Sequence, residues 1–429
     1  MSNSTNILLV GVTGFVGKVV LERLLQDKGI EKIFVVLRPK KKMSVQERFK
    51  ILSDSPCFKN CQNVFSNGVT NACPPCQVVP LQGDITKHNL GLSNCDLQGI
   101  QSIVTHVISL AASVDFDLPL KQAVSINVGG PLNVLDFVKS CQNIERFCHC
   151  STAYVVPATR PEKNTQKVEA VPALEVLPEH FSNGQQNFAQ ETYARIANAK
   201  HISEDEERNI LKAAGLPNTY AYSKALAELI LDEKSDDVPL VIVRPSMIGP
   251  CLVHPFPGWV DCINSIAGWV FLYGGGILHT SIGDPSVKLD VVPCDYVVER
   301  LLYATFKLDL SDERKIPASP IIHATAGHVN SLTYAGTLDS MASFFKDRKN
   351  QVFLKPFWRK KDNILSTTEI EADLAKDKKK LERIRFLMKV VSQKKAAKKL
   401  HKMKKAIENS LSALDHTAQV TTTFIPSSP

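Results

Sequence analysis

Tyr220 and Lys224 are the residues whose types and spacing point most directly to chemistry. They lie four positions apart in PNTYAYSKALAELIL, a segment with the pattern of a helix, and residues four apart share one helix face. A lysine ammonium one turn from a phenol stabilises the phenolate and lowers a pKa that is otherwise near 10. Such a pair can pass a proton to a carbonyl oxygen during hydride transfer, and the lysine can also hydrogen-bond a nicotinamide ribose.

A second hydroxyl group is expected near the same pair. The segment RFCHCSTAYV (146–155) is predicted to be a buried strand that ends at Ser151 and Thr152. Ligands of open α/β sheets bind at the carboxyl ends of the strands. A hydroxyl there can donate a further hydrogen bond to the developing alkoxide. We therefore predict a catalytic set of Tyr220, Lys224, Thr152 and Ser151.

A glycine-rich turn near the N-terminus predicts a nucleotide site. The apolar run NILLV (6–10) is followed by Gly11, Gly14 and Gly17, and then by KVVLERLLQ, which has helical periodicity. Between a buried strand and a helix, such glycines let backbone N–H groups approach a pyrophosphate. The expected cofactor contacts from this turn are Gly11, Thr13, Gly14, Phe15, Val16 and Gly17.

The end of the second strand favours NADP(H) over NAD(H). NAD-binding proteins usually carry an acidic residue about 20 positions beyond the glycines, but this sequence reads LRPKKK there and offers Arg38. A guanidinium suits a 2′-phosphate, and Arg48 in the following helix could assist. Asp84 is expected to meet the adenine amino group. The remaining expected cofactor contacts are Ile85, Ala111, Ala112, Pro245, Ser246 and Ile248, besides Tyr220 and Lys224 themselves.

The elements that position these residues alternate between strands and helices, which predicts an α/β fold with a doubly wound parallel sheet of the Rossmann type. We expect residues 1–315 to form this NADP-binding domain, with substrate-binding segments at about 155–219 and 250–290. Residues 316–429 are expected to form a smaller, mostly helical region with a basic tail.

Charge is distributed unevenly along the 429 residues. The net charge is +8, yet residues 376–405 alone carry 14 lysines and arginines against two acidic residues, so the remainder is mildly acidic. The structural interpretation of this segment is a solvated helix, and the functional interpretation is a site that docks onto anionic lipid or the phosphates of CoA. Nucleic-acid binding is not expected. Because no signal peptide or membrane-spanning segment is recognised, we expect a cytoplasmic protein, or one attached peripherally to the cytosolic face of a membrane.

Several other patterns are given structural interpretations. Cys57, Cys61, Cys73 and Cys76 could hold a zinc ion, but the segment between them is short and irregular, so no metal is expected. Cys148 and Cys150 alternate along a strand and are expected to be core residues. A second Tyr-x-x-x-Lys pair, Tyr303 and Lys307, follows a later strand without a preceding hydroxyl motif, so we set it aside. Asp290 and Asp295 are expected to be structural.

Taken in order, these segments resemble the fatty acyl-CoA reductases, a branch of the extended short-chain dehydrogenases. The similar blocks cover about the first 330 residues, and among them are GVTGFVGKVVLERLL, CSTAYV, PNTYAYSKALAE and HPFPGWVD. The resemblance implies NADPH-dependent reduction of a long-chain acyl-CoA to an aldehyde or a primary alcohol, with release of CoA. It implies Tyr220 as the proton donor, Lys224 as its partner, Thr152 or Ser151 as the polarising hydroxyl, and 250–285 as the wall for the acyl chain.

Three alternatives remain open. One is a reductase of carrier-protein thioesters that stops at the aldehyde, and another is a sugar-nucleotide epimerase or dehydratase. Arg38 and the apolar segment 250–285 disfavour the sugar substrate. The third is a non-enzymatic scaffold, which the complete set of hydroxyl, tyrosine and lysine residues disfavours. The preferred chain length, the final product and the oligomeric state are not determined by these patterns.

Overall fold

The computed structural model describes residues 4–40, 43–61, 76–155, 188–274, 280–282, 284–310, 319–347 and 363–365. The chain divides into two compact units. The first consists of Met1–Ala267 and Val291–Ala326, and the second of Gly268–Asp290 and Gly327–Pro429. This grouping divides the segment 250–290 at residue 268. No helix in the described ranges is both long and apolar enough to cross a bilayer.

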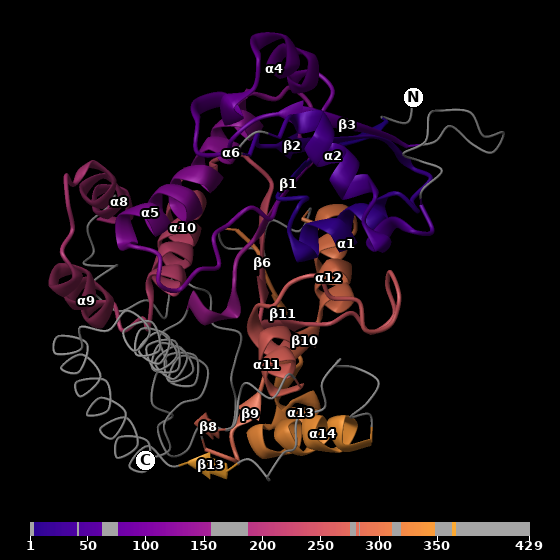
Figure 1. Ribbon diagram of the computed structural model, residues 1–429. Helices are drawn as coiled ribbons and strands as arrows, with labels where there is room; N and C mark the ends of the chain where they lie inside the picture. Colours follow the sequence, from indigo (N-terminus) through magenta and orange to yellow (C-terminus); the bar gives the residue numbers. More distant parts are fainter. Residues whose placement is uncertain are drawn as a thin grey trace, which may run out of the picture. The chain divides into compact units, whose positions relative to one another are not determined.

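A seven-stranded parallel sheet forms the centre of the first unit (Figure 1). Its order is β11-β6-β5-β4-β1-β2-β3, so the chain winds outward from β1 in both directions and confirms the doubly wound fold. Strands buried on both faces read as continuous apolar runs, and all but the first residue of β1 are buried. The strands are β1 (Thr5–Val10), β2 (Ile30–Leu37), β3 (Gln77–Gln82), β4 (His106–Ser109), β5 (Arg146–Cys150), β6 (Leu240–Pro245) and β11 (Ile321–Ala324).

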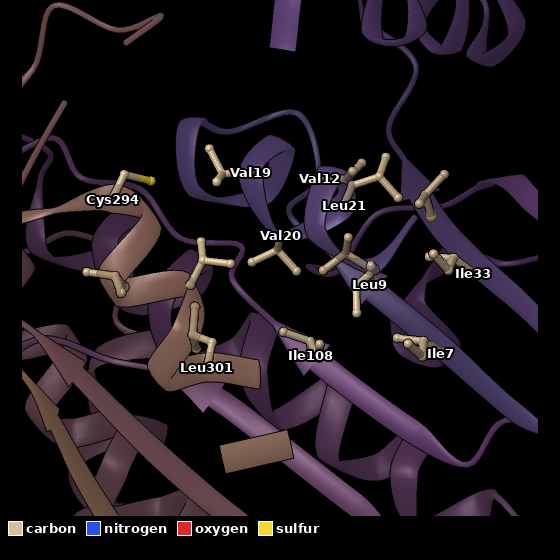
Figure 2. Close-up of a cluster of buried hydrophobic side chains, with 14 of the residues drawn as sticks. Ile7, Leu9, Val12, Val19, Val20, Leu21, Ile33, Ile108, Cys294 and Leu301 are labelled. Atoms are coloured by element: carbon tan, nitrogen blue, oxygen red, sulfur yellow. The ribbon is translucent and has the colours of Figure 1, made fainter. Parts of the chain in front are cut away.

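One face of the sheet is covered by α1 (Phe15–Leu24), α2 (Val45–Ser53) and α12 (Cys294–Phe306). Figure 2 shows how Val20 of α1 and Leu301 of α12 approach Leu9 and Ile108 of the strands. All four side chains are fully buried. Since burial of one such side chain contributes about 1.5–3 kcal/mol, this interface fixes both helices against the sheet.

The opposite face carries α6 (Gly130–Ser140) and α10 (Thr219–Ser235), whose Leu231 packs into the core below β6. In Figure 1 these two helices lie on the other side of the strands from α1 and α12. The α10 helix then reaches α5 (Leu120–Val124), the π-helical turn η3 (Ser125–Gly129) and α8 (Phe188–Asn198) through a third core. Because 13 of its 17 residues are buried, α10 holds its charged side chains Lys224 and Glu228 inside the protein.

The other elements of the first unit are short. They are η1 (Pro56–Phe58), η2 (His88–Gly91), α4 (Asn94–Gln101), η4 (Ala153–Val155), α9 (Glu204–Ala213), and the parallel pair β7 (Met247–Gly249) and β10 (Val291–Pro293). The helix α11 (Ser265–Gly274) begins in the first unit and ends in the second. The second unit contains β8 (Thr280–Ile282), β9 (Lys288–Leu289), α13 (Gly327–Asn330), β12 (Leu332–Thr333), α14 (Tyr334–Asp347) and β13 (Asn363–Leu365).

The reversal of strand order between β1 and β4 determines where a ligand can bind. The two strands are adjacent and parallel, and Val10 pairs with Ser109 at their carboxyl ends. Connections leave these ends in opposite directions, which opens a crevice at the carboxyl edge of a doubly wound sheet. The predicted cofactor turn after β1 and the predicted catalytic hydroxyls after β5 both lie at this edge.

Candidate active site

The glycine turn after β1 has the geometry of a phosphate cradle. Gly11 has φ of +94°, where L side chains are strained, and a Cβ there would lie 2.6 Å from the backbone N of Ala111. A Cβ on Gly17 would collide with the carbonyl oxygen of Gly11. Two of the expected glycines are therefore required by close backbone approach, and one of them lies directly against the expected Ala111.

The first turn of α1 fits an anion. The helix begins at Phe15, and its N-cap residue, Gly14, has no side chain to satisfy the first N–H groups. No acidic residue occupies the first turn, so the positive end of the helix dipole is not opposed by a local carboxylate. Thr13 and Gly14 are exposed here. A Gly-lined cradle with open N–H donors suits a dinucleotide pyrophosphate.

Arg38, Arg48 and Asp84 come together at the carboxyl ends of β2 and β3. Arg38 Nη1 lies 3.9 Å from Asp84 Oδ2, and 63% of its side chain is exposed. Arg48 donates to the carbonyl oxygen of Arg38, which ties α2 to the end of β2. Asp84 also accepts from Thr86 Oγ1 at 2.8 Å. The three expected adenosine-end residues thus form one cluster with an exposed guanidinium.

Tyr220 and Thr152 are joined by a side-chain hydrogen bond. Tyr220 lies in the first turn of α10, which is capped by Asn218 through a 2.8 Å hydrogen bond from the N–H of Ala221. Thr152 Oγ1 also lies 3.4 Å from the carbonyl oxygen of Pro245. The ring of Phe116 packs against the phenol with centroids 5.5 Å apart. The helix start and the strand end therefore place two hydroxyl groups side by side.

Burial raises the pKa of Tyr220 above its ordinary value, and the hydrogen bond from Thr152 opposes that shift. The sequence argument expected Lys224 to lower this pKa, but Lys224 is not among its causes. The ammonium is instead held on the strand side of α10, where Nζ donates to the carbonyl oxygen of Cys150 at 2.7 Å. The phenol therefore remains protonated at neutral pH, as a proton donor must.

Several residues at the site carry no recognisable pattern in a single sequence. Asn127 in η3 donates to Ser113 O and Ser223 Oγ, both at 3.0 Å, and so ties the loop after β4 to α10. Glu228 in α10 and Arg244 in β6 form a buried ion pair. Each lies in an otherwise ordinary helix or strand, so only its partner across the fold reveals it.

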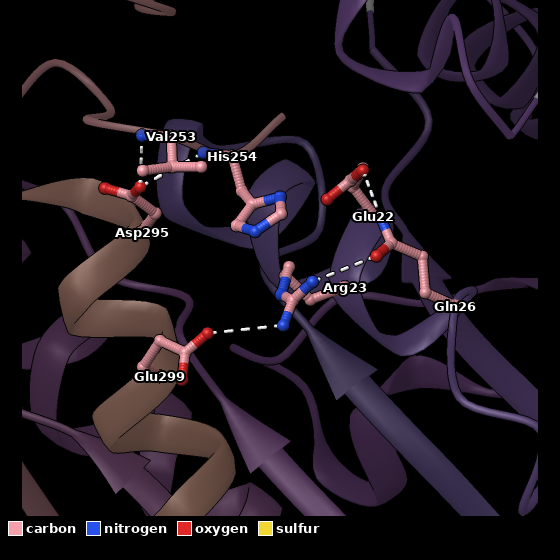
Figure 3. Close-up of polar contacts among 7 residues, drawn as sticks. All are labelled: Glu22, Arg23, Gln26, Val253, His254, Asp295 and Glu299. Atoms are coloured by element: carbon pink, nitrogen blue, oxygen red, sulfur yellow. Dashed lines mark hydrogen bonds and ion pairs between the residues drawn. The ribbon is translucent and has the colours of Figure 1, made fainter. Parts of the chain in front are cut away.

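The segment 252–261, which includes HPFPGWVD (254–261), is anchored to α1 and α12 by polar contacts. Figure 3 shows the contacts of Val253 and His254 with Asp295 of α12. The carboxylate of Asp295 accepts from the backbone N–H groups of Leu252, Val253 and His254 at 2.9, 2.7 and 3.1 Å. Farther along, Asp261 pairs with Lys18 in the first turn of α1. Asp295 thus holds the backbone of residues 252–254 in place, in a loop that also pairs with α1 just after the cofactor turn.

Other expected site residues take no part in the hydroxyl pair. Ser151 is buried and its hydroxyl has no hydrogen-bond partner among the described residues, so the hydroxyl that reaches Tyr220 belongs to Thr152. The carbonyl of Ile85 accepts from Asn133 at 2.7 Å. Ile248 packs into the core, Ser246 is buried, and Ala112 is exposed. Tyr303, set aside above, is 42% exposed on α12.

No cluster of three potential metal ligands occurs in the described part of the chain. Cys57, Cys61 and Cys76 are buried, and burial raises the pKa of Cys61 to about 11 and that of Cys76 to about 12. Cys73 and the basic segment 376–405 lie outside the described residues. Of the segments 155–219 and 250–290 that were expected to contribute to substrate binding, residues 156–187, 275–279 and 283 also lie outside them.

Comparison with known families gives one match over most of the chain. The sequence profile of the male sterility proteins, an NAD-binding family, matches residues 9–301. Among curated proteins, "Fatty acyl-CoA reductase 1" of Arabidopsis thaliana is 30% identical over 365 residues, which cover 81% of this chain and 72% of the relative. "Fatty acyl-CoA reductase 2" of Mus musculus is 28% identical, with 82% of this chain and 64% of the relative covered.

Two solved structures with a similar fold are reductase domains. The terminal R domain from the myxalamid PKS-NRPS pathway is 20% identical, with a TM-score of 0.53 and coverage of 81% of this chain and 70% of that domain. The R domain of a non-ribosomal peptide synthetase from Mycobacterium tuberculosis has a TM-score of 0.52 at 17% identity, with 79% and 71% covered. At these identities the likeness establishes the fold alone.

Proposed function

This chain belongs to the male sterility family of fatty acyl-CoA reductases, and from that premise we propose that it uses NADPH to reduce a long-chain fatty acyl-CoA. The reaction releases CoA and forms a fatty aldehyde, which a second reduction converts to the primary alcohol. The observation that carries the proposal is the hydrogen-bonded pair of Tyr220 and Thr152 at the carboxyl end of β5. The buried ammonium of Lys224 lies in the next turn of α10.

The two hydroxyl groups act on the thioester carbonyl. Thr152 Oγ1 donates a hydrogen bond to the carbonyl oxygen, and Tyr220 Oη transfers a proton to it as negative charge develops. Because burial favours the neutral phenol, Tyr220 enters the reaction protonated. The tetrahedral hemithioacetal then expels CoA as the thiol and leaves the aldehyde. In a second reduction, Thr152 again donates a hydrogen bond to the aldehyde oxygen and Tyr220 again transfers a proton to it.

Lys224 supports this proton transfer through the hydrogen bonds and the charge of its ammonium group. An ammonium has three N–H donors, and two of them are directed at acceptors on β5. We propose that the third is directed at the nicotinamide ribose and stabilises the phenolate that forms when Tyr220 gives up its proton. The phenolate needs this help because burial disfavours its charge.

The residues at the carboxyl edge fit a dinucleotide, which when bound supplies the hydride. Gly11 and Gly17 leave the close approach that a pyrophosphate needs, and the first turn of α1 offers open N–H groups. We propose that Arg38 and Arg48 hold the 2′-phosphate of NADPH. Support comes from the exposed guanidinium of Arg38 and from the link between Arg48 and the Arg38 carbonyl.

The test is turnover of defined substrates by the purified full-length chain. Palmitoyl-CoA with NADPH should yield free CoA thiol and hexadecanal or hexadecanol, detected by a thiol reagent and by gas chromatography. Tyr220→Phe should lose at least about 100-fold in kcat, the scale of general acid catalysis, while binding NADPH normally. Tyr222→Phe is the matched control because Tyr222 is a buried tyrosine on the same helix, packed in the third core.

The substrate alternatives are separate arms of the same assay. Turnover of palmitoyl carrier protein but not of palmitoyl-CoA would replace the proposed substrate, and epimerisation of a sugar nucleotide would replace the reaction. The proposal would be refuted if acyl-CoA substrates across a series of chain lengths caused no oxidation of NADPH. Retained turnover in Tyr220→Phe would refute only the role given to that residue.

Cofactor choice is tested at Arg38. Arg38→Ala should raise the KM for NADPH about 10- to 100-fold, the scale of a charge-assisted hydrogen bond, and leave the KM for NADH nearly unchanged. Lys50→Ala removes the same charge from α2 at a position paired with Asp54 and serves as the control. An equal effect of Arg38→Ala on both cofactors would refute the 2′-phosphate contact.

We also propose peripheral attachment to anionic lipid on the cytosolic face through the basic segment 376–405. Vesicles that contain phosphatidylserine should sediment the full chain at low salt, and a chain without this segment should stay in the supernatant. Equal sedimentation of both proteins would refute the attachment.

A further inference from the structure

Lys224 is a buried charge whose position is set by β5. Its side chain is 1% exposed, and Nζ lies 2.7 Å from the carbonyl oxygen of Cys150 and 3.1 Å from Nε2 of His149. The backbone carbonyl accepts one hydrogen bond from Nζ, and the imidazole accepts a second. Two acceptors on neighbouring residues of one strand determine where the ammonium lies, because a single acceptor would leave it free to rotate about one hydrogen bond.

The carboxylate nearest in sequence is occupied by another partner. Glu228 lies one turn beyond Lys224 on α10, but Arg244 of β6 takes both of its oxygens, with Nε at 3.1 and 3.2 Å and Nη2 at 2.5 Å. Both residues of this ion pair are almost fully buried. The lysine therefore depends on neutral acceptors for its position, and within the described residues His149 is the one side chain to which it is hydrogen-bonded.

His149 is suited to accept this hydrogen bond. It is 1% exposed and lies one residue before the carboxyl end of β5, and burial together with the charge of Lys224 lowers its pKa well below the ordinary value. The imidazole is therefore neutral, and a neutral ring whose Nε2 accepts carries its proton on Nδ1. Within the described residues Nδ1 has no hydrogen-bond partner, so the contact with Lys224 is the one polar interaction that the ring makes there.

We infer that His149 is a positioning residue for the reaction, which holds the Lys224 ammonium at the carboxyl end of β5 so that its third N–H is directed at the cofactor ribose and its charge stabilises the phenolate that forms on Tyr220. This inference rests on the proposed function of Lys224. His149 touches neither substrate nor cofactor, and its effect passes entirely through the lysine. A glutamine at this position keeps an acceptor at the reach of Nε2, whereas a leucine of similar bulk does not.

The experiment compares His149→Leu, His149→Gln and Phe147→Leu in the full-length chain. Phe147 is the matched control because it lies on the same face of β5, is equally buried and contacts the His149 ring edge-on with centroids 6.5 Å apart. Thermal unfolding of each variant measures the structural cost. The functional measurements are kcat and KM with palmitoyl-CoA, and the dissociation constant of NADPH from the quenching of protein fluorescence.

His149→Leu should lower kcat about 10- to 100-fold and weaken NADPH binding, the scale of one hydrogen bond to a charged group. His149→Gln should recover most of both losses, and Phe147→Leu should retain kcat at a comparable loss of thermal stability. The inference is overturned if glutamine restores no more than leucine does, or if Phe147→Leu loses as much kcat as His149→Leu.

Failure of the proposed function would be recognised separately. If the unaltered chain reduces no acyl thioester, that proposal fails on its own, and the NADPH dissociation constants still decide the role of His149. Binding weakened by leucine and restored by glutamine then supports the positioning role. Equal binding in all three variants overturns it.

Discussion

The buried ion pair between Glu228 and Arg244 gives the sharpest stability prediction. Glu228 is 2% exposed in α10 and Arg244 is fully buried in β6, with both carboxylate oxygens bonded to the guanidinium. Glu228→Gln removes the negative charge and leaves Arg244 and Lys224 as positive groups in the same buried layer. Breaking a buried pair in this way costs about 3–5 kcal/mol of unfolding free energy because an uncompensated charge remains.

The double variant Glu228→Leu with Arg244→Met separates the charge effect from the packing effect. It removes both charges and keeps similar volume, so its unfolding free energy should differ little from that of the unaltered chain or should exceed it. Glu233→Gln is the control for the helix, because Glu233 is exposed and accepts a hydrogen bond from Gln190 at the surface. Its effect should stay within about 0.5 kcal/mol.

The assay is urea unfolding followed by far-UV circular dichroism, with hydrogen exchange of the β6 and α10 peptides as a local measure. Hydrogen exchange assigns the loss to the first unit, which matters because the chain has two units. A loss below about 1 kcal/mol for Glu228→Gln would refute the argument, as would a double variant as unstable as the single one. Either result would mean that water or a rearranged side chain compensates Arg244.

Three further predictions concern the elements around the site. Gly17→Ala should destabilise the chain by about 1–3 kcal/mol in urea unfolding and weaken NADPH binding, because the new Cβ collides with the Gly11 carbonyl oxygen. Gly14→Ala is the control and should keep its stability, because a Cβ there lies 3.4 Å from the same oxygen. Asp295→Asn should cost about 1–3 kcal/mol and increase proteolysis near residue 253, since three backbone N–H groups lose a charged acceptor; unchanged cleavage would contradict the anchoring role. Burial lowers the pKa of His106 to about 4, below its value in the unfolded chain, so its contribution of about 3 kcal/mol is complete above about pH 6.5 and is lost as the pH falls toward 4. Urea melts across this range should show that loss, and His106→Leu should flatten it.

Much of the fold followed from local pattern. Apolar runs such as NILLV predicted strands buried on both faces, and their alternation with helical segments predicted the doubly wound parallel sheet. The glycine turn could be placed because backbone conformation and close approach demand glycine itself at Gly11 and Gly17. Tyr220 was expected beside the hydroxyl of Thr152 or Ser151 because strand ends and the helices that follow them meet at one edge of such a sheet.

The tertiary structure decided what depends on neighbours distant in sequence. It selected Thr152 over Ser151 as the partner of Tyr220, because the direction of a side chain at a strand end depends on the packing of β6 beside it. It placed Lys224 against His149 rather than against the phenol. A buried charge is positioned by the acceptors that surround it, and these acceptors belong to β5, 75 and 74 residues away in sequence. Residue types and spacing therefore determined the reaction class, whereas the network that holds the lysine exists only once α10 has packed onto the sheet.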